Sequence, residues 1–427
     1  MKLLAQALVC AALAFAQDPI ATDADTPDAV ATPSADPNGL TADDVQAVVK
    51  AAATALDVKT LVIAVTDRQG NILAVYRKPQ APQTVIGQFG RTVDVNELAV
   101  ATARTAAFFS HNEAPLSSRT VRFISGVHFP PGISFTGNAD LYGIENTNRG
   151  CTFNVNFLPG VDFPYARSID GKGTGLGIQT GKADLKDSDP DAVNPGGIPL
   201  YKNGRMVGGV GVAGASNPIV EYAALLGSVG AGFGPTVPPP GAVFVGGLSL
   251  PFAEQTTAPN GLPAGVLEGS YLVQPKASPA PVPEGNLIQP RAGSQLTLAD
   301  VQKIVQNSID TANTTRGVIR LPLGKKAKMV IAIADLDGSL LALYRMTDST
   351  VFSTDVAVAK ARNVIYFTQN PGTDLPGITA GTAVNNRTIS FGAQPFFPPG
   401  IDYSDPGPFY NLFLKDTANP CTQGAQA

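Results

Sequence analysis

The feature that most constrains this chain is a sixteen-residue pattern that occurs twice. Residues 62–77 read VIAVTDRQGNILAVYR, and residues 330–345 read VIAIADLDGSLLALYR. In each, two apolar runs flank Asp-x-x-Gly, where the aspartate can cap a turn and the glycine can take a positive φ. The pattern predicts a β-hairpin in both places. Its recurrence with matching flanks predicts a duplicated domain.

The sequences around the two hairpins repeat as well. Thr41 and Thr297 each precede an aspartate by three residues, which resembles a capping box at the start of an amphipathic helix. An alanine-rich helix is expected after each hairpin, over 97–109 and 356–367, and FPPGI then recurs at 129–133 and 397–401. Each copy is therefore predicted to begin with a helix and a hairpin and to continue into a second helix.

The two copies differ at their ends. Only the first continues into GGIPLYKNGRMVGGVGVAGAS, residues 196–216, which predicts two strands joined at Asn203-Gly204. The second sheet is thus expected to lack strands unless copy one, the connector or another chain completes it, because an uncovered edge invites pairing. The predicted divisions are a signal peptide (1–16), a disordered acidic tether (17–39), a first domain (40–226), a Gly/Pro-rich linker (227–293), and a second, C-terminally shortened domain (294–427). We call the first domain copy one and the second domain copy two.

The N-terminus has the pattern of a secretory signal. Lys2 precedes an apolar run, and Ala14-Phe15-Ala16 is a small-x-small cleavage site, so we expect a secreted or periplasmic protein. The run is shorter than the roughly 20 residues that cross a bilayer, and no membrane span is expected elsewhere. A net charge of −4 with scattered basic residues gives no field for binding nucleic acid.

Cleavage would leave two cysteines, Cys151 and Cys421, in an oxidising compartment. They occupy aligned contexts, Thr-Asn-Arg-Gly-Cys and Thr-Ala-Asn-Pro-Cys. One hypothesis is a disulfide that joins the two copies, and the alternative is two free or intermolecular thiols, because pairing requires the Cα atoms to come within about 7 Å.

A family resemblance rests on the order of these motifs. LTADDVQ, the first hairpin, the Ala-x-Ala-Arg helix and GGIPLYKNGRMVGGVGVAG together resemble the GlcG/HbpS-like family, whose domain is often labelled haem-degrading, while FPPGI and LYGIENTNRGC resemble a secreted tandem-copy subgroup. The resemblance covers most of 40–226 and, less fully, 296–427. It implies an α/β (α+β) fold of two such domains, each a mainly antiparallel sheet flanked by helices. It also implies a tendency to form homo-oligomers and, in some members, binding of haem or related tetrapyrroles.

Haem iron would need an axial donor in an apolar pocket, and the chain has two histidines, His111 and His128. Both are candidate ligands, with Tyr142 as a weaker oxygen donor. The aligned residues of copy two are Gln369 and Phe396, so the histidines belong to copy one alone. The alternative is that both are ordinary polar loop residues.

Three basic residues of the alanine-rich helices, Arg104, Lys360 and Arg362, are candidates for holding a propionate or another carboxylate. Alternatively, the arginines pair with Asp67 or Asp335 and so tie the helix to the hairpin turn. Asp187, Asp189 and Asp191 alternate in a loop in a spacing that suits calcium, although a solvated acidic turn explains them more simply.

The sequence shows neither H-E-x-x-H nor G-x-S-x-G, so no catalytic residue is assigned and an enzyme is not expected. We expect an exported protein that binds a small planar or anionic ligand, with haem as the first candidate cofactor and calcium as a second. The alternatives are a non-catalytic module that assembles by strand completion, and oxidative haem degradation.

Overall fold

Each of the sixteen-residue patterns forms the predicted hairpin. In the computed structural model, β1 (Val62–Asp67) pairs with β2 (Ile72–Arg77), and β11 (Val330–Ala334) pairs with β12 (Leu340–Arg345), both antiparallel. The registers agree, since Val62 faces Arg77 and Val330 faces Arg345, and both ladders shift by one residue near the turn. Gly70 and Gly338 have φ near 80°, as the turn requires.

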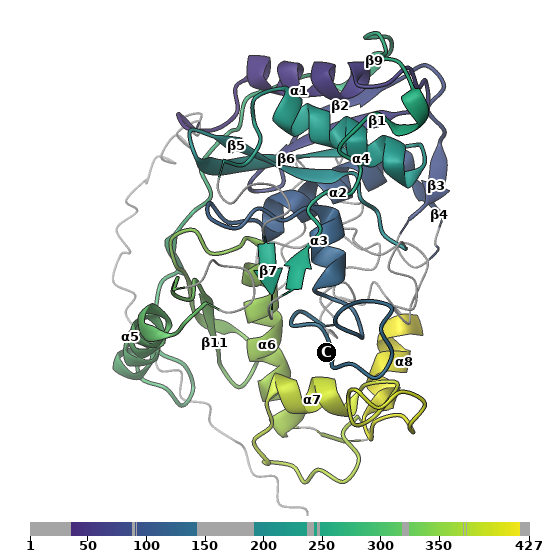
Figure 1. Ribbon diagram of the computed structural model, residues 1–427. Coiled ribbons are helices and arrows are strands. Elements are labelled where there is room, and N and C mark those ends of the chain that lie inside the picture. The colour runs from purple at the N-terminus through teal and green to yellow at the C-terminus, as the bar shows by residue number, and fades with distance from the viewer. Residues whose placement is uncertain are drawn as a thin grey trace, which may run out of the picture. The chain divides into compact units, whose positions relative to one another are not determined.

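The structure describes residues 36–87, 90, 92–142, 192–236, 243–245, 248–317, 324–369, 371–372 and 374–418. Within this part of the chain, the fold class is the predicted one, a mixed α/β arrangement of antiparallel sheets flanked by helices (Figure 1).

Copy one is built on a five-stranded sheet of order β5-β6-β1-β2-β9. Helices α1 and α4 pack on one face of this sheet through a large aliphatic core, and α2 packs on the other face (Figure 1). Besides β1 and β2, this part of the chain comprises α1 (Ala42–Thr54), α2 (Val95–Phe109), β5 (Gly197–Lys202), β6 (Arg205–Ala213), α4 (Asn217–Leu225), a π-helical turn (Leu226–Gly230) and β9 (Ser270–Val273).

The predicted local signals of copy one are confirmed. Thr41 caps α1 in a capping box with Asp44, and Asn203 and Gly204 both take positive φ in the turn between β5 and β6. Gly209 and Gly211 on β6 lie directly against the backbone carbonyls of Ala103 and Ala99. Because neither glycine has a side chain, α2 lies very close to the sheet.

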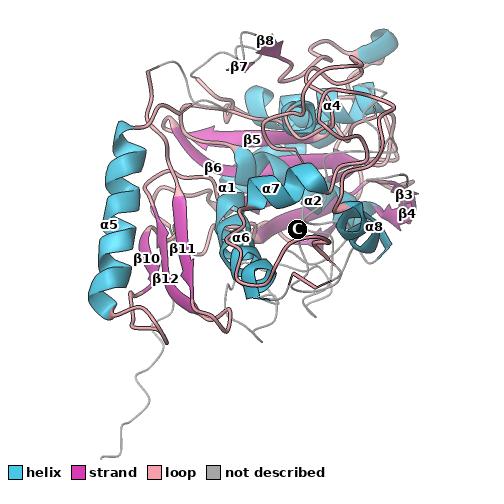
Figure 2. Cartoon of the chain, turned by 90° about the horizontal axis from the view of Figure 1, so that it is seen from below, coloured by secondary structure: helices cyan, strands magenta, loops and turns pink. Residues whose placement is uncertain are grey.

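Copy two has a three-stranded sheet of order β10-β12-β11 between two helices (Figure 2). Residues of α5 (Leu298–Thr314) pack with Ile333 and Leu341, and Val358 of α6 (Phe352–Gln369) packs with Leu340 and Leu343. Thr297 and Asp300 form the predicted capping box. Helix α6 has five buried residues, whereas nearly all of α2 is buried, because no counterparts of β5 and β6 cover α6 in the part described.

The connector between the copies contributes a strand to each sheet. β9 pairs with β2, and β10 (Gly285–Ile288) pairs with β12, so the same edge of each hairpin is covered. Tyr271 of β9 packs edge-on against Tyr76, with 4.9 Å between ring centroids. These strands are short and lack a two-residue period, which explains why the Gly/Pro-rich composition indicated only a linker.

A shared core joins elements of both copies. Phe109 at the end of α2 stacks on Phe352 at the start of α6, with 4.0 Å between centroids, and both belong to one buried cluster. Residues 35–427 form one compact unit. None of the described helices combines the length and the apolar character needed to cross a membrane.

The remaining described elements are short: β3 (Thr84–Ile86), β4 (Thr92–Asp94), α3 (Ser118–Phe123), β7 (Val243–Val245), β8 (Leu248–Leu250), a 3-10 turn (Pro259–Gly261), α7 (Asn386–Gly392) and α8 (Tyr410–Ala418).

Candidate functional site

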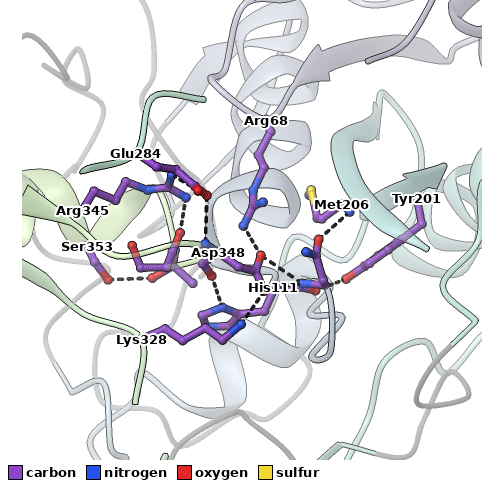
Figure 3. Close-up of polar contacts among 12 residues, drawn as sticks. Arg68, His111, Tyr201, Met206, Glu284, Lys328, Arg345, Asp348 and Ser353 are labelled. Carbon is purple, nitrogen blue, oxygen red and sulfur yellow. Dashed lines mark hydrogen bonds and ion pairs between the residues drawn. The ribbon is translucent and has the colours of Figure 1, made fainter. Parts of the chain in front are cut away.

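Asp348, which lies just after β12 and is 3% exposed, gathers polar contacts from several parts of the described chain (Figure 3). Its carboxylate accepts from Arg68 Nη2 at 2.7 Å and from Lys328 Nζ at 3.2 Å, and the backbone N–H of Asn112 points at the same carboxylate. Its backbone N–H donates to Glu284 Oε1 at 2.9 Å. We call these residues, with His111 and Arg345, the junction, because they bring the two copies and the connector together.

Burial and neighbouring charges shift the pKa values of two junction residues. Burial raises the pKa of the Asp348 carboxyl, but the positive charges of Arg68, His111 and Lys328 outweigh it, so the pKa lies below its ordinary value of 3.8. Burial lowers the pKa of Arg345 to about 10, and its guanidinium donates to the Pro283 and Ser349 carbonyls. Asp348 is therefore held ionised inside the protein.

Both candidate haem-ligating histidines are used to hold the copies together. The Nδ1 atom of His111 lies 2.6 Å from the Asp348 carbonyl oxygen, and its ring is 2% exposed. The Nε2 atom of His128 lies 2.8 Å from Asp402 Oδ1, a residue of the second FPPGI motif region. Both imidazoles thus contact aspartates of copy two rather than face an apolar pocket.

The paired arginines of the alanine-rich helices take equivalent positions. Arg104 Nε donates to the Gly70 carbonyl at 3.0 Å, and Arg362 Nε donates to the Gly338 carbonyl at 3.0 Å. Arg104 is 2% exposed and lies beneath the turn. Each arginine therefore ties a helix to its hairpin turn.

The other predicted site residues are not brought together with these. Lys360 is exposed on α6, and burial of part of its side chain lowers its pKa. Tyr142 lies in a turn, where its backbone N–H donates to the Ala139 carbonyl. The cysteines Cys151 and Cys421, the carboxylates Asp187, Asp189 and Asp191, and the signal sequence lie outside the described residues. Among the described residues, no group of His, Cys, Asp and Glu side chains could hold a metal ion.

A cavity of about 340 Å³ lies beside the first hairpin turn. Its walls come from that turn, from the start of β6 and from the connector: Asp67, Arg68, Gln69, Arg205, Met206, Val207, Ser278 and 280–284, with Asp36 and Asn38. This volume is at the small end of the range of about 300–1,000 Å³ that is usual for ligand pockets. The lining is about half polar and half apolar, which suits a ligand that has both kinds of group.

The acids and bases of this cavity differ in how far they are already paired. The Asp67 carboxylate accepts from Gln69 N and Asn71 N, and Glu284 accepts from Asp348 N. By contrast, the buried Nε of Arg68 has no hydrogen-bond partner among the described residues, and the exposed Arg205 has no partner among them either. Arg205 is therefore a solvent-accessible cation of the lining with no partner among the described residues.

Haem ligation through the histidines does not fit this geometry. His111 and His128 are buried, each bonds to copy two, and the cavity beside the first turn has no histidine in its lining. An axial bond from either imidazole would require it to give up its contact with an aspartate of copy two. The described residues thus provide no haem pocket with a histidine donor.

The sequence reasoning missed Arg68, Arg205 and Asp348. A signal for the first was present, because copy two has the apolar Leu336 at the position of Arg68, between the Asp and the Gly that both turns share. Asp348 aligns with Gln80, so it too distinguishes the copies. A comparison of where the repeats differ, rather than where they agree, would have drawn attention to both.

Comparison with known proteins gives one family match. Residues 296–387 match the model of the family described as "Haem degrading protein HbpS-like". No curated protein matches the chain.

Two solved structures are similar over part of the chain. One, titled as the PduOC:heme complex, is 17% identical, covers 46% of this chain and 98% of its own, and has a TM-score of 0.27. The other, Klebsiella pneumoniae protein ORFY, is 17% identical, covers 44% of this chain and 87% of its own, and has a TM-score of 0.24. Similarity at this level says nothing of what this chain binds.

The family match falls in copy two, which contains the second hairpin and the Ala-x-Ala-Arg helix. The resemblance indicated by the repeated motifs is thereby confirmed, and residues 296–387 of this chain carry an HbpS-like sequence.

Proposed function

We propose that this protein binds a small carboxylate-bearing ligand in the cavity beside Arg68. The observation that supports this most directly is the pairing state of the lining: Asp67 and Glu284 accept hydrogen bonds from the protein, whereas the exposed Arg205 has no partner among the described residues. Arginine donors recognise carboxylates through charge-assisted hydrogen bonds. The cavity adjoins the junction, so a bound anion would also lie near the charges around Asp348.

Two probes carry the carboxylate that this cavity is proposed to bind. Hemin presents it as a tetrapyrrole propionate, and citrate presents it as a small free acid. We expect isothermal titration to show binding of one of them, and Arg205→Gln to weaken it about 10-fold, the effect of losing about 1.4 kcal/mol of binding free energy. Arg205 is exposed, so its loss should leave the fold intact. Arg387→Gln, which removes another exposed arginine, is the matched control. Equal affinities in the wild type and Arg205→Gln would contradict the proposal.

A second candidate function is haem binding, which the HbpS-like match at 296–387 favours. Because both histidines are engaged in contacts with aspartates of copy two, the hemin spectrum of a His111→Ala, His128→Ala variant should equal that of the wild type. A Soret band that moves in the variant, with far-UV circular dichroism unchanged, would restore the histidine-ligation model.

We also propose that the protein acts outside the cytoplasm, on the strength of the signal pattern over 1–16. Expression with the native N-terminus, followed by fractionation and N-terminal sequencing, should give a mature chain that begins at Gln17. Recovery of the chain in the cytoplasm with Met1 retained would contradict this.

A further inference from the structure

The two sheets differ at one edge. In both copies a connector strand covers the second strand of the hairpin, β9 on β2 and β10 on β12. In copy one the other edge, β1, pairs with β6 along its whole length. In copy two the equivalent edge, β11, pairs with no strand other than β12 among the described residues.

The backbone groups of this edge can be assigned. Met346 N–H donates to the Met329 carbonyl, and Asp335 N–H donates to the Ser339 carbonyl, so odd-numbered residues point toward β12. Since the direction alternates along a strand, Val330, Ala332 and Ala334 present their N–H and C=O groups to the open edge. Their equivalents in copy one, Val62, Ala64 and Thr66, lie opposite Ala213, Gly211 and Gly209 of β6.

The exposed edge lacks the features that usually prevent strand pairing. Val330–Ala334 contains no proline and no charge, and four of its five residues are half-buried, while all six residues of β1 are buried. Edges of this kind are templates for a further strand.

Charge along this strand selects the direction of the partner. Lys326 precedes β11, and Asp335 and Asp337 follow it, whereas the neighbouring Lys325 and Lys328 are already paired with Glu113 and Asp348. An antiparallel copy of the same strand would place the basic start of each beside the acidic end of the other. A parallel copy would place like charges together.

We propose that β11 pairs antiparallel with β11 of a second copy of this chain, with Ala332 opposite Ala332 at a two-fold axis. Val330 then faces Ala334 of the partner, and the two three-stranded sheets become one six-stranded sheet. Such an interface is isologous, so it closes at the dimer. This inference concerns copy two alone and is independent of the anion site.

Disulfide trapping tests the register. In a hydrogen-bonded antiparallel pair the Cα atoms lie about 5.5 Å apart, within the range that a disulfide bridges. With Cys10, Cys151 and Cys421 replaced by alanine, Ala332→Cys should form a disulfide-linked dimer under mild oxidation. Ala64→Cys is the matched control, because β6 of the same chain already pairs with that position. Equal cross-linking of the two variants would overturn the proposal.

Sedimentation of the full chain tests the contact without cysteines. The wild type should sediment as a dimer. Ala332→Pro, which removes an N–H that faces away from β12, should sediment as a monomer with unchanged circular dichroism. Lys326→Glu and Asp337→Lys should each weaken the dimer, and the double variant should restore it. A wild-type monomer, or a dimer that persists in Ala332→Pro, would overturn the proposal. So would a monomer whose Ala332 amide is protected from hydrogen exchange, because a segment of the same chain would then cover the edge.

Discussion

Asp348 has a φ of 57°, a conformation that few residues other than glycine adopt, although aspartate tolerates it. From this position it contacts Arg68, Lys328 and Asn112 through its carboxylate and His111 through its carbonyl. His111 therefore acts as a structural residue that hydrogen-bonds to Asp348, and His128 acts in the same way with Asp402.

Replacing Asp348 by asparagine should lower the free energy of unfolding by about 3 kcal/mol, because Arg68 and Lys328 would be left without their buried counter-charge. Urea denaturation measures this change. Asp405→Asn, at another exposed aspartate, is the control and should change stability by less than about 0.5 kcal/mol. Equal effects of the two variants would show that the junction does not contribute to stability.

The same residue predicts a pH dependence. The folded-state pKa of Asp348 lies below 3.8, its ordinary value, so its stabilisation is complete above that pH and is lost as the pH falls through the lower folded value. The difference in unfolding free energy between wild type and Asp348→Asn should be full at neutral pH and should shrink below pH 3.8. A difference that stays constant in acid would contradict this assignment.

At the scale of elements, the contrast between α2 and α6 follows from β6. Gly209 and Gly211 let α2 lie close to the sheet of copy one, whereas α6 has no described strand in that position and retains a half-exposed surface. The same sequence pattern thus gives a buried helix in one copy and a partly exposed helix in the other.

Gly211→Ala should destabilise the protein by about 3 kcal/mol, because a Cβ at this position would overlap the Ala99 carbonyl oxygen and force α2 away from the sheet. Gly137→Ala is the control, since nothing lies within 4 Å of a Cβ there. Thermal unfolding compares the two, and similar melting temperatures would show that the helix adjusts freely.

At the scale of the whole molecule, Phe109 of copy one and Phe352 of copy two belong to the same buried cluster, and both lie in one compact unit, residues 35–427. We therefore expect the two copies to unfold in one calorimetric transition. Phe352→Ala should cost about 4 kcal/mol, as large-to-small changes in a core do. Leu414→Ala, at a residue 48% exposed, should cost far less. Two separate transitions in the wild type would contradict a shared core.

Much of the local structure was predictable from the sequence, and much of the site was not. The capping residues Thr41 and Thr297, the turn at Asn203-Gly204 and both hairpins depend on interactions among neighbours, so their patterns suffice. The short strands β9 and β10 form only because they pair with β2 and β12, which lie far from them in the sequence. Their own residues show no alternation of apolar and polar side chains that would predict a strand.

The sequence by itself determined the repeated hairpin, its helices and the HbpS-like resemblance, because backbone turn geometry and apolar periodicity are local properties. Only the tertiary structure decided that His111 and His128 hold the copies together, that Arg68 lines a cavity, and that β11 is an open edge. Those facts depend on which residues, far apart in the sequence, come into contact in the fold. Such contacts produce no periodic pattern in the sequence from which they could be predicted.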